Sequence, residues 1–254
     1  MADKILEFNK VARITVYFWI MKVLATTLGE ILGDFFSMTL NLGYIVSFAI
    51  TVVFFLVVLI TQLKALKFHS TLYWLVIVGT TTVGTEISDL MDRTLGLGYA
   101  LGSLILFSCL LLVLFLWHRS EKEIKVYPIT EPRIEAFYWI AILFSNSLGT
   151  AFGDYLSDNM GLSYLVGAEV TAAIIVVVVA LHYYTKINQI LLFWIAFIFT
   201  RPFGATFGDL MTKPLAKGGL NFGRGTAALI AAGLLSFIVY YSTRKEKAGE
   251  LKNA

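Results

Sequence analysis

The sequence repeats one short unit four times along an otherwise apolar chain. Each copy has a tryptophan, a glycine ten residues later, and a small residue followed by an aspartate, a pattern written W-x9-G-x3-[GS]-D. The four copies begin at Trp19, Trp74, Trp139 and Trp194, and they end at Asp34, Asp89, Asp154 and Asp209. Internal repetition of this kind indicates that each copy forms one structural unit. The chain is therefore predicted to fold as four copies of the same unit.

Composition places these units in a membrane. The chain is 58% hydrophobic and only 15% charged, whereas soluble domains carry about 25% charged residues. A helix needs about 20 apolar residues to cross a bilayer core. Eight such runs are present, near residues 13–35, 43–63, 71–91, 98–117, 136–156, 163–183, 190–211 and 224–242. The sequence thus predicts an all-α polytopic membrane protein with eight transmembrane helices. Its expected partner is the lipid bilayer.

The spacing of the repeats indicates two successive duplications. The aspartates are 55, 65 and 55 residues apart, so the second half repeats the first at an offset of 120. We expect two four-helix halves, residues 13–117 (repeats 13–63 and 71–117) and residues 136–242 (repeats 136–183 and 190–242). A polar linker, 118–135, joins the halves, and 1–12 and 243–254 are terminal tails. Because each repeat contains two crossings, all four enter the membrane from the same side, as parallel repeats.

Basic residues predict the orientation of the chain. They concentrate in the tails, in the linker and in the loops near Lys64 and Lys186, whereas fewer lie beside the Gly-Asp ends. By the positive-inside rule, both termini are cytoplasmic and the four Gly-Asp ends face outward. The basic tails are read as topology signals, so no nucleic-acid partner is expected.

The glycines and aspartates of the repeat call for different explanations. Small residues four apart, such as Gly29 and Gly33, let helices pack closely inside a membrane. Packing does not require a charge, and an ionisable group in a span is costly and usually marks a functional site. The aspartates lie near the helix ends, where the cost falls, so a structural role in ending each helix remains an alternative. The tryptophans are expected to anchor the helices at the interface or to pack against lipid.

Further polar residues share the helical faces of the aspartates, because residues three, four and seven positions earlier lie on the same side of a helix. Lys22 lies deeper as internal counter-charge, and Glu169 enters from the sixth helix. The predicted ion-binding residues are Asp34, Asp89, Asp154, Asp209, Glu30, Glu86, Thr27, Thr82, Thr150 and Arg201, of which the six carboxylates are the predicted metal ligands.

Carboxylates, hydroxyls and carbonyls form oxygen-only ligand sets that suit hard cations such as Mg²⁺, Ca²⁺ or Mn²⁺. Close carboxylates can also share and relay protons. We therefore expect a small transporter or channel for a cation, preferably a divalent metal and with proton coupling as an option. The cation is the substrate, and no cofactor is expected. The alternative is a membrane scaffold or sensor in which the Gly-Asp motifs only fix helix packing.

An enzyme is not expected. The three histidines fall near the opposite helix ends from the aspartates, and the chain has no nucleophile elbow, HExxH or phosphate-binding loop. A single cysteine, Cys109, provides no disulfide framework.

The fourth repeat departs from the other three. Pro202 should kink its first helix because proline removes a backbone donor. Lys213, Pro214 and a glycine-rich loop through Gly219 follow its aspartate. We expect this repeat to gate or specialise the site.

The four Gly-Asp units resemble a family of bacterial inner-membrane proteins built from a short repeated transmembrane unit that ends in Gly-Asp, a repeat of unknown function. The resemblance covers nearly all of residues 13–242, with Ser88 in place of the usual glycine in the second copy. It implies the repeated fold and an inner-membrane location, and it implies no activity.

Overall fold

The computed structural model describes residues 8–253, with side chains up to residue 245. Within these residues there are eight long helices and no strand. The helices are α2 (Val16–Asp34), α3 (Gly43–Lys64), α4 (Ser70–Asp89), α5 (Tyr99–Glu121), α6 (Pro132–Asp154), α7 (Tyr164–Tyr184), α8 (Gln189–Thr212) and α9 (Arg224–Asn253). The prediction of an all-α protein with eight helices is confirmed. In the described part of the chain, seven helices are long and apolar enough to span a membrane, and the threonine-rich α4 is the other.

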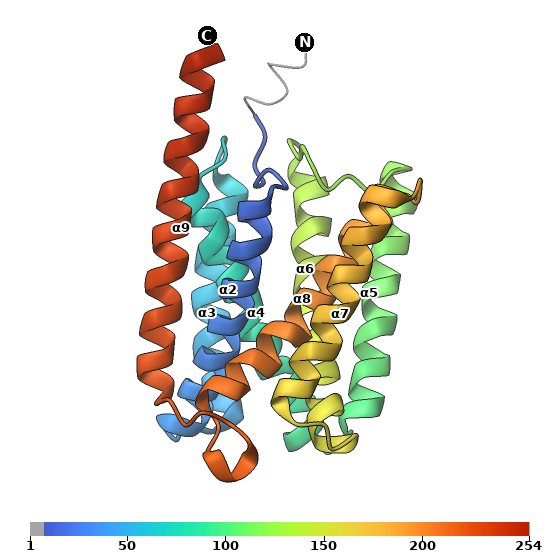
Figure 1. Ribbon diagram of the computed structural model, residues 1–254. Coiled ribbons are helices and arrows are strands. Elements are labelled where there is room, and N and C mark those ends of the chain that lie inside the picture. The colour runs from blue at the N-terminus through green and yellow to red at the C-terminus, as the bar shows by residue number, and fades with distance from the viewer. Residues whose placement is uncertain (1–7, 254) are drawn as a thin grey trace.

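The first helices of the four repeats form a closed ring. Helix α2 packs against α4, α4 against α6, α6 against α8, and α8 returns to α2 (Figure 1). The contacts keep the same order along neighbouring helices, since Gly29 of α2 lies against Thr81 and Gly33 lies against Thr85. The four inner helices are therefore parallel to one another.

The second helices of the repeats surround this ring. Helix α3 packs on α4, α5 on α6, α7 on α8, and α9 on α2, so each outer helix covers the inner helix of the next repeat. In their most apolar stretches, the outer helices bury only 22–33% of their residues, whereas α2, α6 and α8 bury 61–67%. Exposed apolar side chains on the outer helices are the surface that a bilayer would cover.

The repeated glycines lie where the inner helices meet. A Cβ added at Gly29 would overlap the Thr81 side chain, and one at Gly204 would overlap Thr26. At Gly84 it would lie 3.0 Å from the backbone nitrogen of Ser147. Glycine thus lets neighbouring backbones approach closely, as small residues do in membrane helices.

Three of the inner helices end in the same unusual turn. A five-residue π-helix follows the repeated aspartate directly, at Phe35–Thr39, Leu90–Thr94 and Tyr155–Asn159. Such turns are rare in proteins, and those that occur are often found at functional sites. In the fourth repeat Pro214 has no backbone N–H to donate, and a short 3₁₀ turn at Leu215–Lys217 follows instead.

Three of the four repeated tryptophans do not face lipid. Trp74, Trp139 and Trp194 are buried in the core, so their expected role as lipid-facing anchors is wrong, whereas Trp19 is partly buried. Each repeat also has an aromatic residue directly before the tryptophan: Phe18, Tyr73, Tyr138 and Phe193. Trp74 packs on Phe18 with ring centroids 5.6 Å apart, and Trp139 packs on Tyr73 at 5.3 Å. These buried aromatic side chains close the interior of the helix ring at the end opposite the aspartates.

Both chain ends lie at that same end of the bundle (Figure 1). Residues 1–7 of the predicted tail 1–12 are outside the described residues, but Lys10 and Val11 are buried. Lys10 forms an ion pair with Glu135, and its backbone N–H donates to Ile129 of the linker at 2.9 Å. At the other terminus, α9 continues past the predicted boundary at 242 to Asn253.

Candidate functional site

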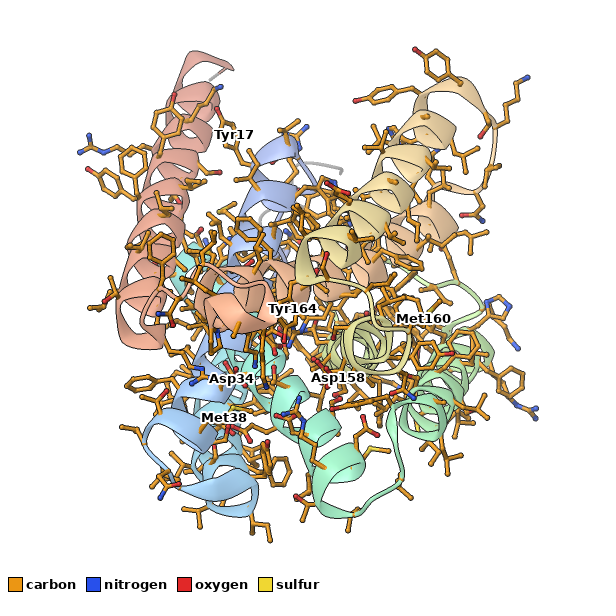
Figure 2. The ribbon with its side chains drawn as sticks, turned by 60° about the horizontal axis from the view of Figure 1, so that its bottom comes forward. Tyr17, Asp34, Met38, Asp158, Met160 and Tyr164 are labelled. Carbon is orange, nitrogen blue, oxygen red and sulfur yellow. The ribbon has the colours of Figure 1, made fainter. Side chains whose placement is uncertain are left out.

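The four repeated aspartates gather at one end of the inner ring, which we call the aspartate end. Each is the last residue, or nearly the last, of its α-helix, and each is 2–6% exposed. Figure 2 looks toward this end and shows Asp34 beside the loops that leave the ring. Buried carboxylates require partners, and here the partners are basic side chains.

Two basic residues each bridge a pair of aspartates. Arg93 Nε lies 2.9 Å from Asp89 Oδ1, and its Nη2 lies 3.4 Å from Asp154 Oδ2. Lys213 Nζ lies 3.1 Å from Asp209 Oδ1 and 2.8 Å from Asp34 Oδ2. Arg93 and Lys213 are related by the same 120-residue offset as the aspartates. Each cation therefore joins its own helix to the next inner helix of the ring.

The fourth repeat adds a third cation to one side of the aspartate end. Arg224 Nε lies 3.3 Å from Asp34 Oδ2, and the guanidinium also reaches Thr39. Burial lowers the pKa of Lys213, but the carboxylates of Asp209 and Asp34 outweigh this effect and hold its pKa above the ordinary value. Lys213 therefore remains an ammonium. Asp34 faces two cations, whereas among the described residues Asp154 has only the longer contact to Arg93.

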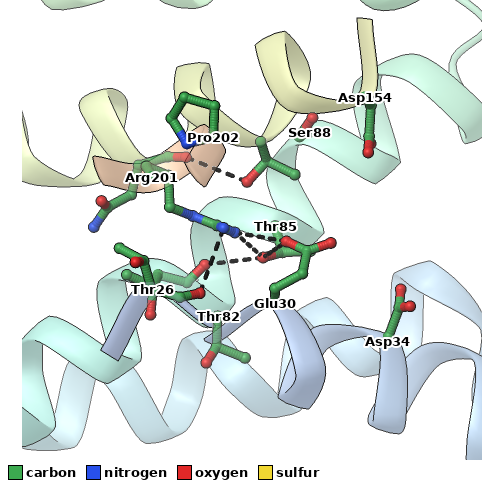
Figure 3. A network of polar contacts seen from close by, with 12 residues as sticks. Thr26, Glu30, Asp34, Thr82, Thr85, Ser88, Asp154, Arg201 and Pro202 are labelled. Carbon is green, nitrogen blue, oxygen red and sulfur yellow. Dashed lines mark hydrogen bonds and ion pairs between the residues drawn. The ribbon is translucent and has the colours of Figure 1, made fainter. Parts of the chain in front are cut away.

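A second polar layer lies deeper inside the ring. The Arg201 guanidinium is fully buried and donates to Glu30 Oε2 at 2.9 Å and to the Thr85 hydroxyl. Figure 3 shows Arg201 reaching from α8 toward Glu30 and Thr85, with Asp34 and Asp154 beyond them. Because α8 and α4 are opposite members of the ring, the Arg201–Thr85 hydrogen bond crosses its interior.

The third layer contains Lys22, which is also fully buried. Its Nζ donates to Asn146 Oδ1 at 2.8 Å and lies 3.9 Å from the centroid of the Phe197 ring. Asn146 in turn donates to the Thr80 hydroxyl at 3.0 Å. Helices α2 and α6 are opposite in the ring, so this layer also crosses the interior.

Glu86 differs from the other buried carboxyls. It is 0% exposed, and one of its oxygens accepts a hydrogen bond from Ser47 of α3. The other oxygen, Oε2, has no hydrogen-bond partner among the described residues. Within this part of the chain no basic side chain forms an ion pair with it, so Glu86 lies at the α3–α4 contact without a counter-cation.

The remaining predicted residues are only partly brought together with these layers. Thr150 is buried and donates to the Asn146 carbonyl at 3.3 Å, and Thr27 is buried on α2 with a hydroxyl that has no partner among the described residues. Thr82 instead lines an apolar groove between α3 and α9, on its α4 floor. Glu169, expected to enter the site, is exposed on α7.

Sequence reasoning missed Arg93 and Lys213 as ion-pair partners, because both follow their spans and were read as loop residues. The available signal was their position, since each lies four residues after an aspartate and the two are 120 residues apart. Asn146 was missed as well. It occupies the position three before the repeat glycine, where the other copies have Thr26, Thr81 and Arg201.

The described residues contain no group of three or more His, Cys, Asp or Glu side chains placed to hold a metal ion. Five of the six carboxylates predicted as metal ligands instead pair with basic side chains, three of them at the aspartate end and Arg201 in the layer below, and Glu86 pairs with none among the described residues. The site therefore consists of two pairs of aspartates, each bridged by one basic side chain, with Arg224 as an additional cation on Asp34 and with the Arg201–Glu30 ion pair buried beneath them.

Comparison with known proteins supports the fourfold repeat. No match was found among curated proteins or among solved structures. One family model, described as Repeat of Unknown Function (DUF347), matches four segments: residues 17–67, 72–123, 137–188 and 192–248. These segments cover most of the chain and coincide with the four helix pairs, so this multi-pass membrane protein belongs to the DUF347 repeat family.

Proposed function

We propose that the protein is a transporter for a small cation, with the aspartate end as the mouth of its pathway. The observation that carries the proposal is the stack of buried charged layers inside a closed ring of parallel helices. Charged groups within a membrane protein are costly and mark substrate or ion pathways in known cases. Repeats that surround a common axis also place equivalent residues around one pathway.

The bridging side chains favour a cation over an anion. Lys213 and Arg93 each occupy a point where carboxylates of two adjacent helices converge. Each point is thus shaped to receive a positive group, and the flexible lysine stem can withdraw its ammonium from such a place. In the proposed cycle, an incoming cation takes over the two carboxylates when the basic side chain moves aside.

The deeper layers favour a carrier over an open channel. Arg201 and Lys22 place two basic side chains across the interior of the ring, and these oppose free flow of cations along it. The buried aromatic residues before the tryptophans close the other end. An alternating opening of the two ends would let a bound cation pass, and Glu86, with no counter-cation, is the carboxyl best suited to exchange a proton.

A monovalent or organic cation is favoured over a divalent metal. Metal ions need several oxygen ligands at once, and in this arrangement the aspartates are engaged by basic side chains. Transport of Mn²⁺ or Mg²⁺ would require the aspartate end to rearrange into a larger ligand set. The divalent-metal prediction is therefore kept as the second choice of substrate.

The charge distribution supports a cytoplasmic membrane location with both termini inside. Exposed basic residues at the end opposite the aspartates include Lys64, Lys67, Arg119, Lys125 and Arg133. Under the positive-inside rule this end faces the cytoplasm. The aspartate end would then face the outside of the cell.

The test is flux through proteoliposomes, screening Na⁺, K⁺, methylammonium, Mn²⁺, Mg²⁺ and protons. The informative variants are Asp154→Asn and Glu86→Gln, because neither leaves a buried cation without a carboxylate. We expect each to reduce flux about tenfold or more, the effect of losing an interaction of ~1.4 kcal/mol, at an unchanged melting temperature. Asp158→Asn is the matched control, since Asp158 lies four residues later and is exposed.

The scaffold alternative makes the opposite prediction. If the aspartates only fix helix packing, no ion moves, Glu86→Gln changes nothing, and Asp154→Asn lowers the melting temperature or has no effect. That result would overturn the transport proposal.

A further inference from the structure

A long apolar groove opens on the lipid-facing side of the bundle, between the outer helices α9 and α3. Its floor is formed by α2 and α4, and its volume is about 970 Å³, near the upper end of the range for ligand sites. None of the charged layers contributes to its lining. The residues along it include Leu28, Leu32, Phe36, Phe54, Leu235 and Val239.

Polar residues are concentrated at one end of the groove. His69, Ser70 and Thr71, at the start of α4, line the end opposite the aspartates, together with Tyr240 and Thr243 of α9. The remaining walls are formed mainly by aliphatic and aromatic side chains, with Thr51, Thr82 and Ser236 as scattered hydroxyl-bearing residues. A molecule that fills this space must therefore have a polar head and a long apolar body.

One cationic side chain, Arg244, lies beside the polar end. The Arg244 guanidinium lies 4.8 Å from the centroid of the Tyr240 ring, and exposed His69 is within the lining. Helix α4 begins at Ser70 with no side-chain cap, which leaves backbone N–H groups available to an anionic oxygen. These groups favour a negatively charged head.

The length of the groove fits one leaflet of a bilayer. From His69 to Thr82 the α4 wall rises about 20 Å at 1.5 Å per residue, and half of a hydrocarbon core is about 15 Å. An acyl chain anchored at His69 would extend along α4 beyond the middle of the membrane. Both the length and the charge match a lipid of the leaflet at that end.

We propose that this groove binds an anionic phospholipid, with its phosphate near His69 and Arg244 and its acyl chains between α9 and α3. The lipid fills the seam where the last helix of the fourth repeat meets the first repeat. It thereby completes the packing of α9 against the ring.

The experiment is native mass spectrometry of the full-length protein with phosphatidylglycerol or phosphatidylcholine of identical acyl chains. We expect the wild type to retain one phosphatidylglycerol in preference to phosphatidylcholine. Ser236→Trp, which fills the groove, should abolish this retention. Leu234→Trp is the matched control, because Leu234 is an exposed residue of α9 outside the lining, and it should bind as the wild type does.

A second variant tests the head-group contact without filling the groove. Arg244→Gln should reduce the preference for phosphatidylglycerol by about fivefold, the effect of one basic residue near a membrane surface. Lys186→Gln, an exposed basic change at the same end, should not reduce it. Equal retention of both lipids by the wild type would overturn the proposal, as would full retention in a folded Ser236→Trp variant. If Ser236→Trp does not fold, the proposal is overturned when the Arg244→Gln variant prefers phosphatidylglycerol as strongly as the wild type does.

Discussion

At the scale of single residues, the buried ion pair between Arg201 and Glu30 is the contact whose loss by mutation should destabilise the protein most. Arg201 is 0% exposed and Glu30 is 4% exposed, so neither charge can turn to water. Removing one partner of such a pair costs about 3–5 kcal/mol, because the other charge is left uncompensated.

We therefore predict that Arg201→Gln strongly destabilises the protein and that adding Glu30→Gln restores much of the loss. Thermal unfolding of the purified single and double variants measures both effects. A double variant that is no more stable than Arg201→Gln would show that Glu30 is not the group left uncompensated.

Lys213 supports a second prediction, which tests whether its ammonium stands in for a transported cation. Lys213→Gln removes the group that joins Asp34 to Asp209, and we expect a loss of roughly 1–3 kcal/mol in unfolding free energy, the scale of charged hydrogen bonds. Added methylammonium should recover part of this stability by occupying the same place.

The control is Lys217→Gln, an exposed lysine of the same loop, which should unfold as the wild type does and show no methylammonium response. A Lys213→Gln protein that gains no more stability from methylammonium than the wild type would argue against a cation site between these aspartates.

At the scale of helices, the sequence predicted which segments form long helices but not how they pack. The eight apolar runs match the eight helices within a few residues, except that α9 continues past the predicted boundary at 242 to Asn253. Hydrophobic length defines the apolar part of a helix and not a polar extension of it. The pairing of each outer helix with the next repeat was not predictable, since apolar side chains can pack equally well on either neighbouring helix or on lipid.

The candidate site was also predicted only in part, because contacts between helices do not follow from the pattern within one helix. Repetition singled out the aspartates, and helical spacing brought in Glu30 and Glu86. The ion pairs of Arg93 and Lys213 depend on contacts between repeats, which a pattern within one repeat does not contain. The buried tryptophans were misplaced because their usual interfacial preference was overridden by aromatic neighbours such as Phe18 and Tyr73.

The glycines give a prediction about helix packing. Gly29→Ala should destabilise the bundle by about 1–3 kcal/mol, as overpacking of a close contact does, because its Cβ would overlap Thr81. Gly233→Ala on α9 is the matched control, since a Cβ there meets nothing within 4 Å. We expect it to leave unfolding unchanged or to stabilise the helix slightly. Chemical unfolding of both variants decides the point, and equal stability would mean that the ring does not need close contact at Gly29.

At the scale of the whole molecule, the ring has no natural beginning. Helix α8 contacts α2 as α2 contacts α4, and α9 of the last repeat covers α2 of the first. The linker connects the halves at the same end of the bundle that contains both termini (Figure 1). The order of the two halves along the chain should therefore matter little to the fold.

We predict that a circular permutant beginning at residue 124, with a flexible connection from residue 254 to residue 1, folds and transports as the natural chain does. The new break falls between the exposed residues Glu123 and Lys125, and it leaves Ile129 and Glu135 able to hold the segment around Lys10. The entropic cost of closing the new connection differs little from that of the natural linker, because doubling the length of a loop costs only ~0.6 kcal/mol. Melting temperature and ion flux of the permutant, compared with the natural chain, are the measurements. A cross-link between cysteines placed at Tyr17 and Tyr241 reports whether α9 packs on α2. Loss of this cross-link in a membrane-inserted permutant would show that the ring closes only in the natural order. The rings of these two residues lie 6.0 Å apart between centroids, so the same cross-link in the natural chain provides the reference.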